Sequence, residues 1–359
     1  MFKKIIRILL IQIFSNMNYA KKIYIFLITI TIVVVLIYGQ SIIIPFILAI
    51  LFWFLIRVIK KLLSKVKFTR KWPVWILTLI SSVVLLSFLV LAVQMISKNI
   101  QHLSNTLPVY EANIAKMANS INERFEIDLF SMMSDYAKDL NFGGILSSLF
   151  SALTGLFGSA FTVLLYLVFL LLEEPIFPKK LKAMYPNIER YNHINELVGK
   201  IDYSIGNYIS LKTATSLLTG TLSYFALLFI GIDAPLFWAF LIFVLNFIPT
   251  IGSLIATIFP TIFAILQFGE FTPGFLVLAI IGSIQIVVGN FIEPKLMGNS
   301  LNISPLVVFL TLAIWGVIWG VTGMLLSVPI TVILIIIMSE FPGTKPIAIL
   351  LSRRGKLNK

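Results

Sequence analysis

The 359-residue sequence contains no cysteine and only two histidines. Without cysteine the chain can form neither a disulfide nor a thiolate metal site. His102 and His193 are far apart in sequence and outside the apolar runs, which disfavours a metal site built on imidazole. The phosphate-binding pattern G-x-x-x-x-G-K-[ST] is also missing, so nucleotide hydrolysis by this chain is not expected. No cofactor is predicted.

Charged residues are scarce as well, at 12% of the chain, with 28 basic and 15 acidic side chains. Hydrophobic residues make up 59%, and the mean hydropathy is +1.00. A soluble domain has no core large enough to hide that much apolar surface. The composition therefore predicts a protein that crosses a membrane several times.

The net charge of +13 is unevenly distributed. Residues 1–22 hold five basic side chains and no acid, residues 57–71 hold seven and no acid, and residues 340–359 hold five and one acid. Residues 97–139 instead hold four basic and six acidic side chains. Lysine and arginine are retained on the cytoplasmic side, so the asymmetry predicts two cytoplasmic termini. It indicates contact with the lipid bilayer and no nucleic-acid partner.

The apolar runs predict an all-α fold, a polytopic membrane protein with about eight spans, two of them broken or re-entrant. A spanning helix needs about 20 apolar residues. The predicted spans are residues 23–39, 42–56, 73–95, 145–172, 213–232, 235–268, 274–292 and 305–338. Two of these runs are too long for one straight helix.

Polar segments divide the spans into parts. The N-terminus has a short apolar run that contains Arg7 and no cleavage site, so it is predicted as an amphipathic cytoplasmic helix rather than a signal peptide. Two polar excursions carry apolar residues at helical spacing and are predicted as amphipathic helices. The expected order is residues 1–22 (N-terminus), 23–95 (three spans), 96–144 (extracytoplasmic excursion), 145–172 (fourth span), 173–212 (cytoplasmic excursion), 213–338 (transport core) and 339–359 (basic tail).

Residues 285–329 are the most informative stretch. Residues 296–339 contain no charge, yet the run begins with N-F-I-E-P-K-L-M-G-N-S at 290–300, and N-F-I-P at 246–249 is similar. Each motif combines asparagine with a helix-breaking proline near a glycine, although a short match can arise by chance. Paired interrupted helices are typical of transporter substrate sites. The predicted substrate path comprises Asn246, Pro249, Gly252, Gln285, Asn290, Glu293, Pro294 and Gly298.

Two interpretations remain open for Glu293 and Lys295, because both could line a path or be solvated in a loop at the membrane surface. Gln285 lies deeper, so its side-chain amide needs an internal partner. Three glycines, Gly316, Gly320 and Gly323, are predicted to share one helix face that permits close packing. Helix packing or gating is predicted for Pro305, Gly316, Gly320, Gly323 and Pro329.

Two long segments carry a family resemblance. Residues 231–253 read GIDAPLFWAFLIFVLNFIPTIGS, and residues 289–329 begin GNFIEPKLMGNSLNISPLVVFLTL and end GMLLSVP. With E-E-P-I-F-P-K-K-L at 173–181, they resemble the AI-2E (autoinducer-2 exporter) family of bacterial membrane proteins over nearly the whole chain. The resemblance implies an inner-membrane transporter that forms homo-oligomers. Members are associated with autoinducer-2 export, and some with sodium/proton antiport.

The chain departs from the family pattern at Val288, where many members carry an acid two residues before the motif asparagine. An ion-coupling role for that acid does not transfer, and Glu293 is the nearest carboxylate. The leading hypothesis is therefore export of a small polar solute such as autoinducer-2, by a secondary or facilitated mechanism. The alternative is an antiporter exchanging a monovalent cation for a proton, and a third reading is a scaffold without transport. No span holds a nucleophile–base pair or metal-ligand cluster, so no enzyme activity is predicted.

Overall fold

The computed structural model describes residues 19–125, 160–297, 302–353 and 355. Over these residues the secondary structure is helical, apart from one isolated bridge between Ile303 and Ser352. The predicted all-α fold is confirmed. Most of the amphipathic N-terminus, the later part of the first excursion, the start of the fourth span and Gly298 lie outside the described residues.

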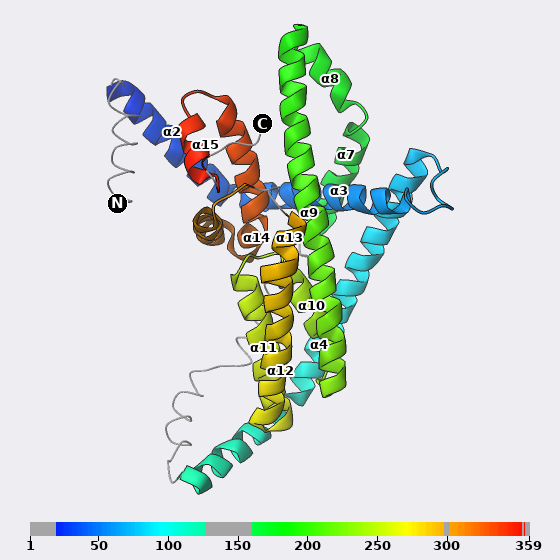
Figure 1. The fold of residues 1–359 in the computed structure, drawn as a ribbon, viewed down its shortest axis with the longest axis vertical. Helices are drawn as coiled ribbons and strands as arrows, with labels where there is room; N and C mark the ends of the chain where they lie inside the picture. The colour runs from blue at the N-terminus through cyan, green and yellow to red at the C-terminus, as the bar shows by residue number, and fades with distance from the viewer. Residues whose placement is uncertain (1–18, 126–159, 298–301, 354, 356–359) are drawn as a thin grey trace. The chain divides into compact units, whose positions relative to one another are not determined.

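The helices are coloured in chain order in Figure 1. Their bounds are α2 Tyr19–Tyr38, α3 Gln40–Leu63, α4 Val74–Phe125, α7 Ala160–Glu173, α8 Phe177–Met184, α9 Ile188–Ile230, α10 Pro235–Leu245, α11 Ile251–Phe268, α12 Phe271–Val287, η1 Val288–Ile292, α13 Glu293–Met297, α14 Pro305–Glu340 and α15 Lys345–Leu351. The chain forms two compact units. One comprises Met1–Ile50, Thr162–Ile201 and Asn302–Lys359, and the other comprises Leu51–Phe161 and Asp202–Leu301.

Six helices in the described part are long and apolar enough to cross a membrane, or up to seven if the bent pair α7–α8 is one span. About eight were predicted, and the difference lies in two runs. In the first, the apolar part described is Phe26–Tyr38, and in the fourth, it belongs to the bent pair α7–α8. Large apolar side chains remain uncovered, among them Phe229 and Val317 at 86% and 89% exposure. Uncovered apolar side chains on long helices are suited to contact with lipid.

In the second unit, α10 and α11 form a helical hairpin that turns at residues 246–250. Pro249 cannot donate a helical hydrogen bond, and Thr250 has a φ of 60°, so the helix ends there. Gly252 fits tightly into the turn, because a Cβ at this position would lie 1.8 Å from the carbonyl oxygen of Leu245. The turn falls at the first of the two predicted interruptions.

The open end of the hairpin is closed by Gln267, near the end of α11. Its Oε1 accepts from the backbone N–H of Asp233 at 2.8 Å, and its Nε2 donates to the carbonyl of Gly231 at 2.9 Å. The start of α10 and the end of α11 therefore lie together. We infer that residues 235–268 enter and return on one side, as a re-entrant hairpin. This is one of the two forms predicted for the interrupted runs, although the predicted span count treated residues 235–268 as one crossing.

The long helix α4 holds the same end of the hairpin. Its span, Val74–Asn99, continues without a break into the first excursion. There Asn113 Nδ2 donates to the carbonyls of Leu266 and Gln267 at 3.1 and 2.9 Å, and the Tyr110 hydroxyl donates to Asp233 at 3.3 Å. Burial raises the pKa of Tyr110, so the hydroxyl keeps the proton that it donates. The excursion thus anchors the hairpin.

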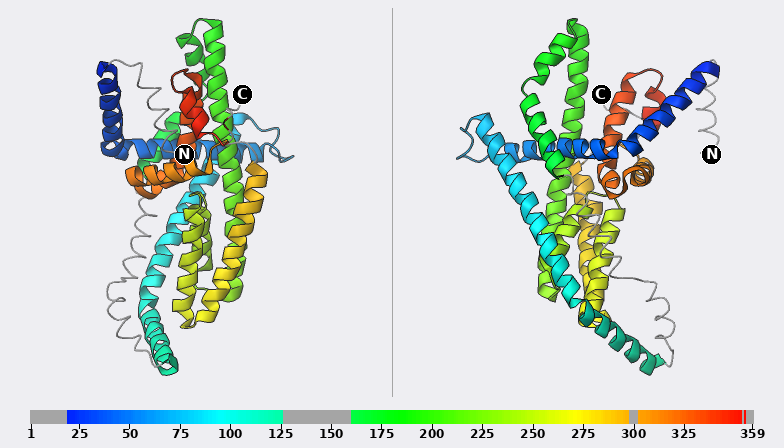
Figure 2. Two further views of the ribbon diagram at one scale, coloured as in Figure 1. Left: turned by 60° about the vertical axis from the view of Figure 1, so that its left-hand side comes forward. Right: turned by 180° about the vertical axis from the view of Figure 1, so that it is seen from behind.

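Next to the hairpin, α11 and α12 run side by side (Figures 1 and 2). The second predicted interruption, at residues 290–298, is not a break over the part described, because α12, η1 and α13 form one span, Phe271–Met297. In η1 the helix widens, and the backbone N–H of Glu293 donates to the carbonyl of Val288, five residues earlier. The wider turn accommodates Pro294, whose ring would clash with a preceding carbonyl in an α-helix.

The C-terminal run has its interruption further along, inside α14. Trp319 and Gly320 leave helical geometry, and Gly320 adopts φ 61° and ψ −142°, a conformation open mainly to glycine. A Cβ on Gly323 would lie 1.9 Å from the carbonyl oxygen of Trp315, so the chain doubles back tightly. The prediction that Gly316, Gly320 and Gly323 share one helix face is wrong, because the helix is interrupted between them.

Candidate functional site

A buried polar face runs along α9 in the second unit. Its six side chains recur at short helical spacings and are all buried: Tyr208, Lys212, Thr215, Ser216, Thr219 and Ser223. Leu217, Leu222 and Phe225 are instead exposed. A helix in water would bury its leucines and expose its hydroxyls. The reverse arrangement indicates a membrane helix whose polar face lines the interior of the protein.

Lys212 and Glu293 form an ion pair at one end of this face. Lys212 Nζ lies 2.6 Å from Glu293 Oε1, and the two side chains are 5% and 18% exposed. At 1.5 Å per residue, Lys212 lies about 27 Å from Ile230 at the end of α9, close to the ~30 Å of a bilayer core. The pair therefore stands near one boundary of the crossing, and the hydroxyl residues from Thr215 to Ser223 lie deeper.

The wide turn of η1 directs Glu293 toward this pair. The buried side of α12 includes Ile281 and Gln285, and η1 continues it with Val288. In a regular helix of 3.6 residues per turn, Glu293 would be rotated away from Gln285, eight residues earlier. A turn that closes over five residues instead keeps Glu293 in line with Val288. The carboxylate thus points inward, although Lys295 in the same short helix is exposed.

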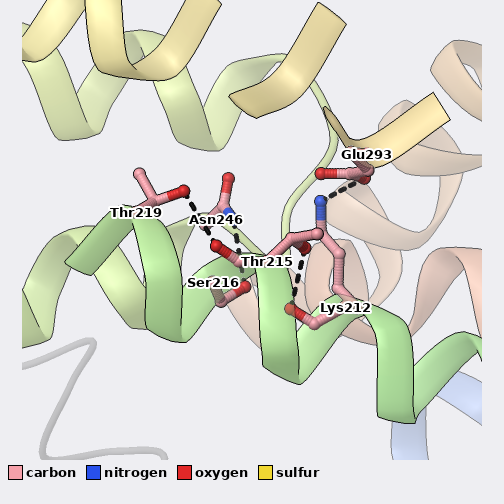
Figure 3. A network of polar contacts seen from close by, with 6 residues as sticks. All are labelled: Lys212, Thr215, Ser216, Thr219, Asn246 and Glu293. Atoms are coloured by element: carbon pink, nitrogen blue, oxygen red, sulfur yellow. Dashed lines mark hydrogen bonds and ion pairs between the residues drawn. The ribbon is translucent and has the colours of Figure 1, made fainter. Parts of the chain in front are cut away.

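Asn246, at the tip of the hairpin, contacts the polar face further along. Its Nδ2 donates to the Ser216 hydroxyl at 3.0 Å, and Asn246 is 4% exposed (Figure 3). The close approach of α10 to α9 depends on Gly220 of α9, because a Cβ at this position would lie 3.1 Å from the carbonyl oxygen of Ala239 in α10. Three separate elements, α9, the hairpin tip and the start of α13, therefore supply polar groups to one site.

The threonine hydroxyls of the site donate to their own helix. Thr215 donates to the carbonyl of Lys212 at 3.1 Å, and Thr219 donates to the carbonyl of Thr215 at 2.9 Å (Figure 3). A hydroxyl that donates in this way keeps its lone pairs, so both threonines can accept from a bound molecule.

Several buried polar atoms have no hydrogen-bond partner among the described residues. They include Tyr208 Oη, Ser223 Oγ and Gln285 Nε2. Leaving a buried donor unpaired costs about 1–3 kcal/mol, so such groups are normally satisfied by water or a ligand. The internal partner expected for the Gln285 amide is thus not found in the described part of the chain. These atoms make the region suited to binding a polar molecule.

The two similar motifs differ in their burial. Asn246 is buried, whereas Asn290, Phe291 and Pro294 are exposed. Pro249 and Gly252 shape the hairpin turn. In the other unit, Pro305 lies in the first turn of α14, where its missing N–H does no harm, and Pro329 is buried within that helix.

Lys212, Thr215, Ser216 and Thr219 were not predicted from the sequence. The predicted span began at residue 213, directly after Lys212, which was assigned to the polar excursion. The helix in fact runs through this boundary without a break. The signal was the spacing of Thr215, Thr219 and Ser223, which places hydroxyls on one helix face amid leucines.

A polytopic helical membrane protein with a buried polar site between a spanning helix and a re-entrant hairpin has the architecture of a transporter. The sequence model of the AI-2E family transporter, which describes the family as a whole, matches residues 24–343 of this chain. The chain therefore belongs to the AI-2E transporter family, and it is a multi-pass membrane protein.

Curated relatives agree with this assignment. The chain is 33% identical over 324 residues to the AI-2 transport protein TqsA of Escherichia coli (strain K12), covering 89% of this chain and 92% of that protein. It is 35% identical over 254 residues to a putative transport protein of Borreliella burgdorferi, covering 69% and 68%. It is 32% identical over 327 residues to a putative transport protein of Haemophilus influenzae, covering 87% and 90%.

Proposed function

We propose that this transporter exports a small polar metabolite such as autoinducer-2 across the bacterial inner membrane, by a secondary or facilitated mechanism. The observation that carries the proposal is the buried polar face of α9 with unpaired donors beside it. The name of the Escherichia coli relative, an AI-2 transport protein, supports autoinducer-2 as the solute. The basic ends of the chain support cytoplasmic termini. The family resemblance supports a homo-oligomer.

The proposed path uses the hydroxyls of α9 together with Asn246, Gln285 and the Lys212–Glu293 pair. Neutral hydroxyl and amide groups suit a hydroxyl-rich solute, because each can donate or accept without adding charge. The Asn246–Ser216 contact couples the hairpin tip to α9. A change in the position of the tip would therefore open or close the path at that level.

The test is solute flux in vesicles that contain the purified protein. Wild-type protein is expected to carry autoinducer-2 down its gradient. Asn246→Ala removes a buried hydrogen bond to Ser216 worth about 1.4 kcal/mol, so we expect flux to fall about tenfold.

Asn290→Ala is the matched control, because Asn290 has the same local motif but is exposed. Its flux should stay within about twofold of wild type. No flux by wild-type protein, or equal losses in both variants, would contradict the proposed path.

A cation/proton antiporter is the second candidate, because Glu293 offers a carboxylate inside the protein. The ammonium group of Lys212 already neutralises that carboxylate, so an incoming cation would have to displace it. This pairing favours the polar solute over the cation. Sodium flux that changes with pH, is lost in Glu293→Gln and occurs without autoinducer-2 flux would favour the antiporter.

A further inference from the structure

We propose that the Lys212–Glu293 ion pair is a charge filter, which holds the net charge of the path at zero and thereby excludes small ions while admitting uncharged polar solutes. The inference rests on the proposed function, since it explains the selectivity of the same path. It assigns a specificity-determining role to two side chains at one end of the polar face.

The pair borders three stretches of the site that carry no formal charge. Residues 213–230 of α9, residues 235–268 of the hairpin and residues 271–292 of α12 and η1 contain no Asp, Glu, Lys or Arg. Lys212 and Glu293 stand at the ends of two of these stretches and contact each other directly. Loss of either charge would leave the path with a net charge of one sign.

The balance of charges explains why ions would be excluded. An anion that binds Lys212 must separate it from Glu293 and leave a carboxylate without its partner, and a cation that binds Glu293 does the same to Lys212. Removing one partner of a buried pair lowers the folding equilibrium constant by roughly 10²- to 10⁴-fold, and an ion that separates the pair would meet a comparable cost. Lys212 and Glu293 are sufficiently buried, at 5% and 18% exposure, for this cost to apply.

An uncharged hydroxyl compound escapes that cost. One hydroxyl can accept from the Lys212 ammonium and donate to the Glu293 carboxylate at the same time, so that both charges remain compensated. The groups around the pair are likewise uncharged. Thr215 keeps its lone pairs, and the Tyr208 hydroxyl is a buried group without a partner in the described residues. The site therefore complements a neutral solute that both donates and accepts.

The experiment measures ion permeability and autoinducer-2 flux in vesicles that contain the full-length protein. Tracer sodium and tracer chloride are the probes. Lys212→Gln leaves the Glu293 carboxylate alone, so we expect sodium permeability to rise at least about tenfold. Glu293→Gln leaves the Lys212 ammonium alone, so chloride permeability should rise by a similar factor.

Two controls separate the filter from general damage. The double variant Lys212→Gln/Glu293→Gln restores zero net charge and should be as ion-tight as wild type, even if the singles are less stable. Asp202→Asn changes one charge on the same helix, ten residues before Lys212, in a pair with Arg57 that is about one-third exposed. It should alter neither permeability.

The filter would be overturned if neither Lys212→Gln nor Glu293→Gln raised ion permeability. It would also be overturned if both variants leaked the same ion. Sodium/proton exchange by wild-type protein would overturn it too. Failure of the proposed function has a different signature, because a wild type without autoinducer-2 flux can still have variants with opposite ion leaks. That result would support the charge filter and contradict autoinducer-2 as the solute.

Discussion

A lysine buried inside a membrane protein needs a compensating charge, and Lys212 finds one in Glu293. The Arg57–Asp202 pair is a useful contrast. Both of its side chains are about one-third exposed, and the Arg57 guanidinium also lies 4.8 Å from the ring of Trp53. Water screens a pair of this kind, so its net contribution is small. The two pairs therefore differ in what the loss of one partner should cost.

At the residue scale we predict non-additive stability for the buried pair. Lys212→Met should lower the free energy of unfolding by about 3 kcal/mol, because it leaves the Glu293 carboxylate without its partner. The double variant Lys212→Met/Glu293→Met should recover most of that loss, since apolar side chains replace both charges. Thermal unfolding in detergent is the measurement. A double variant less stable than either single variant would contradict a coupled buried pair.

At the scale of elements, the hairpin α10–α11 brings Asn246 to α9. Its turn depends on Pro249 and Gly252, and its open end depends on Gln267 and on Asn113 of α4. Asn246 itself keeps helical geometry, and its backbone N–H donates to the carbonyl of Ile242 at 3.0 Å. The wide turn of η1 positions Glu293. Only Glu293 is thus positioned by a departure from regular α-helix, whereas Asn246 stands at the regular end of α10.

The tight turn can be tested with one methyl group. In Gly252→Ala the new Cβ would meet the Leu245 carbonyl oxygen at 1.8 Å, so the hairpin must shift. We expect a loss of about 1–3 kcal/mol in unfolding free energy, together with slower solute flux. Gly282→Ala is the control, because its Cβ would make an ordinary contact of 3.9 Å with Thr257. Equal stability of the two variants would argue against the turn described here.

At the scale of the whole molecule, the hairpin changes how the chain threads the membrane. A single crossing by residues 235–268 would place Asp233 and Glu270 on opposite sides. The hydrogen bonds of Gln267 instead bring the two ends of the hairpin together. The span from Phe271 to Met297 then returns the chain to the side where Lys212 lies.

The threading can be measured directly, because the chain has no cysteine of its own. Asp233→Cys and Glu270→Cys should both react with a membrane-impermeant maleimide added to the same side. Lys295→Cys, beyond the end of η1, should react only from the opposite side. Labelling of Asp233→Cys and Glu270→Cys from opposite sides would rule out the re-entrant hairpin.

Much of the fold follows from the sequence because hydrophobic runs are local features. The runs at 42–56 and 274–292 lie within candidate spanning helices of the structure, and the run at 73–95 begins one residue before such a helix. Pro249 and Gly252 likewise predicted an interruption, since proline removes a helical hydrogen bond wherever it stands. Pro294 misled the same reasoning, because a wider turn can absorb a proline without ending the helix.

The sequence by itself determined the class of the protein and its apolar segments, and it predicted Asn246, Gln285 and Glu293 as candidate site residues. Only the tertiary structure decided which groups meet. Lys212 and Glu293 are 81 residues apart, and their contact depends on the fold-back of the hairpin and the register of α12 against α9. Local composition fixes which segments leave water, but a buried charge is compensated by whatever the packing places beside it. Glu293 was predicted from the sequence, but Lys212 was recognised only from its contact with Glu293 in the fold.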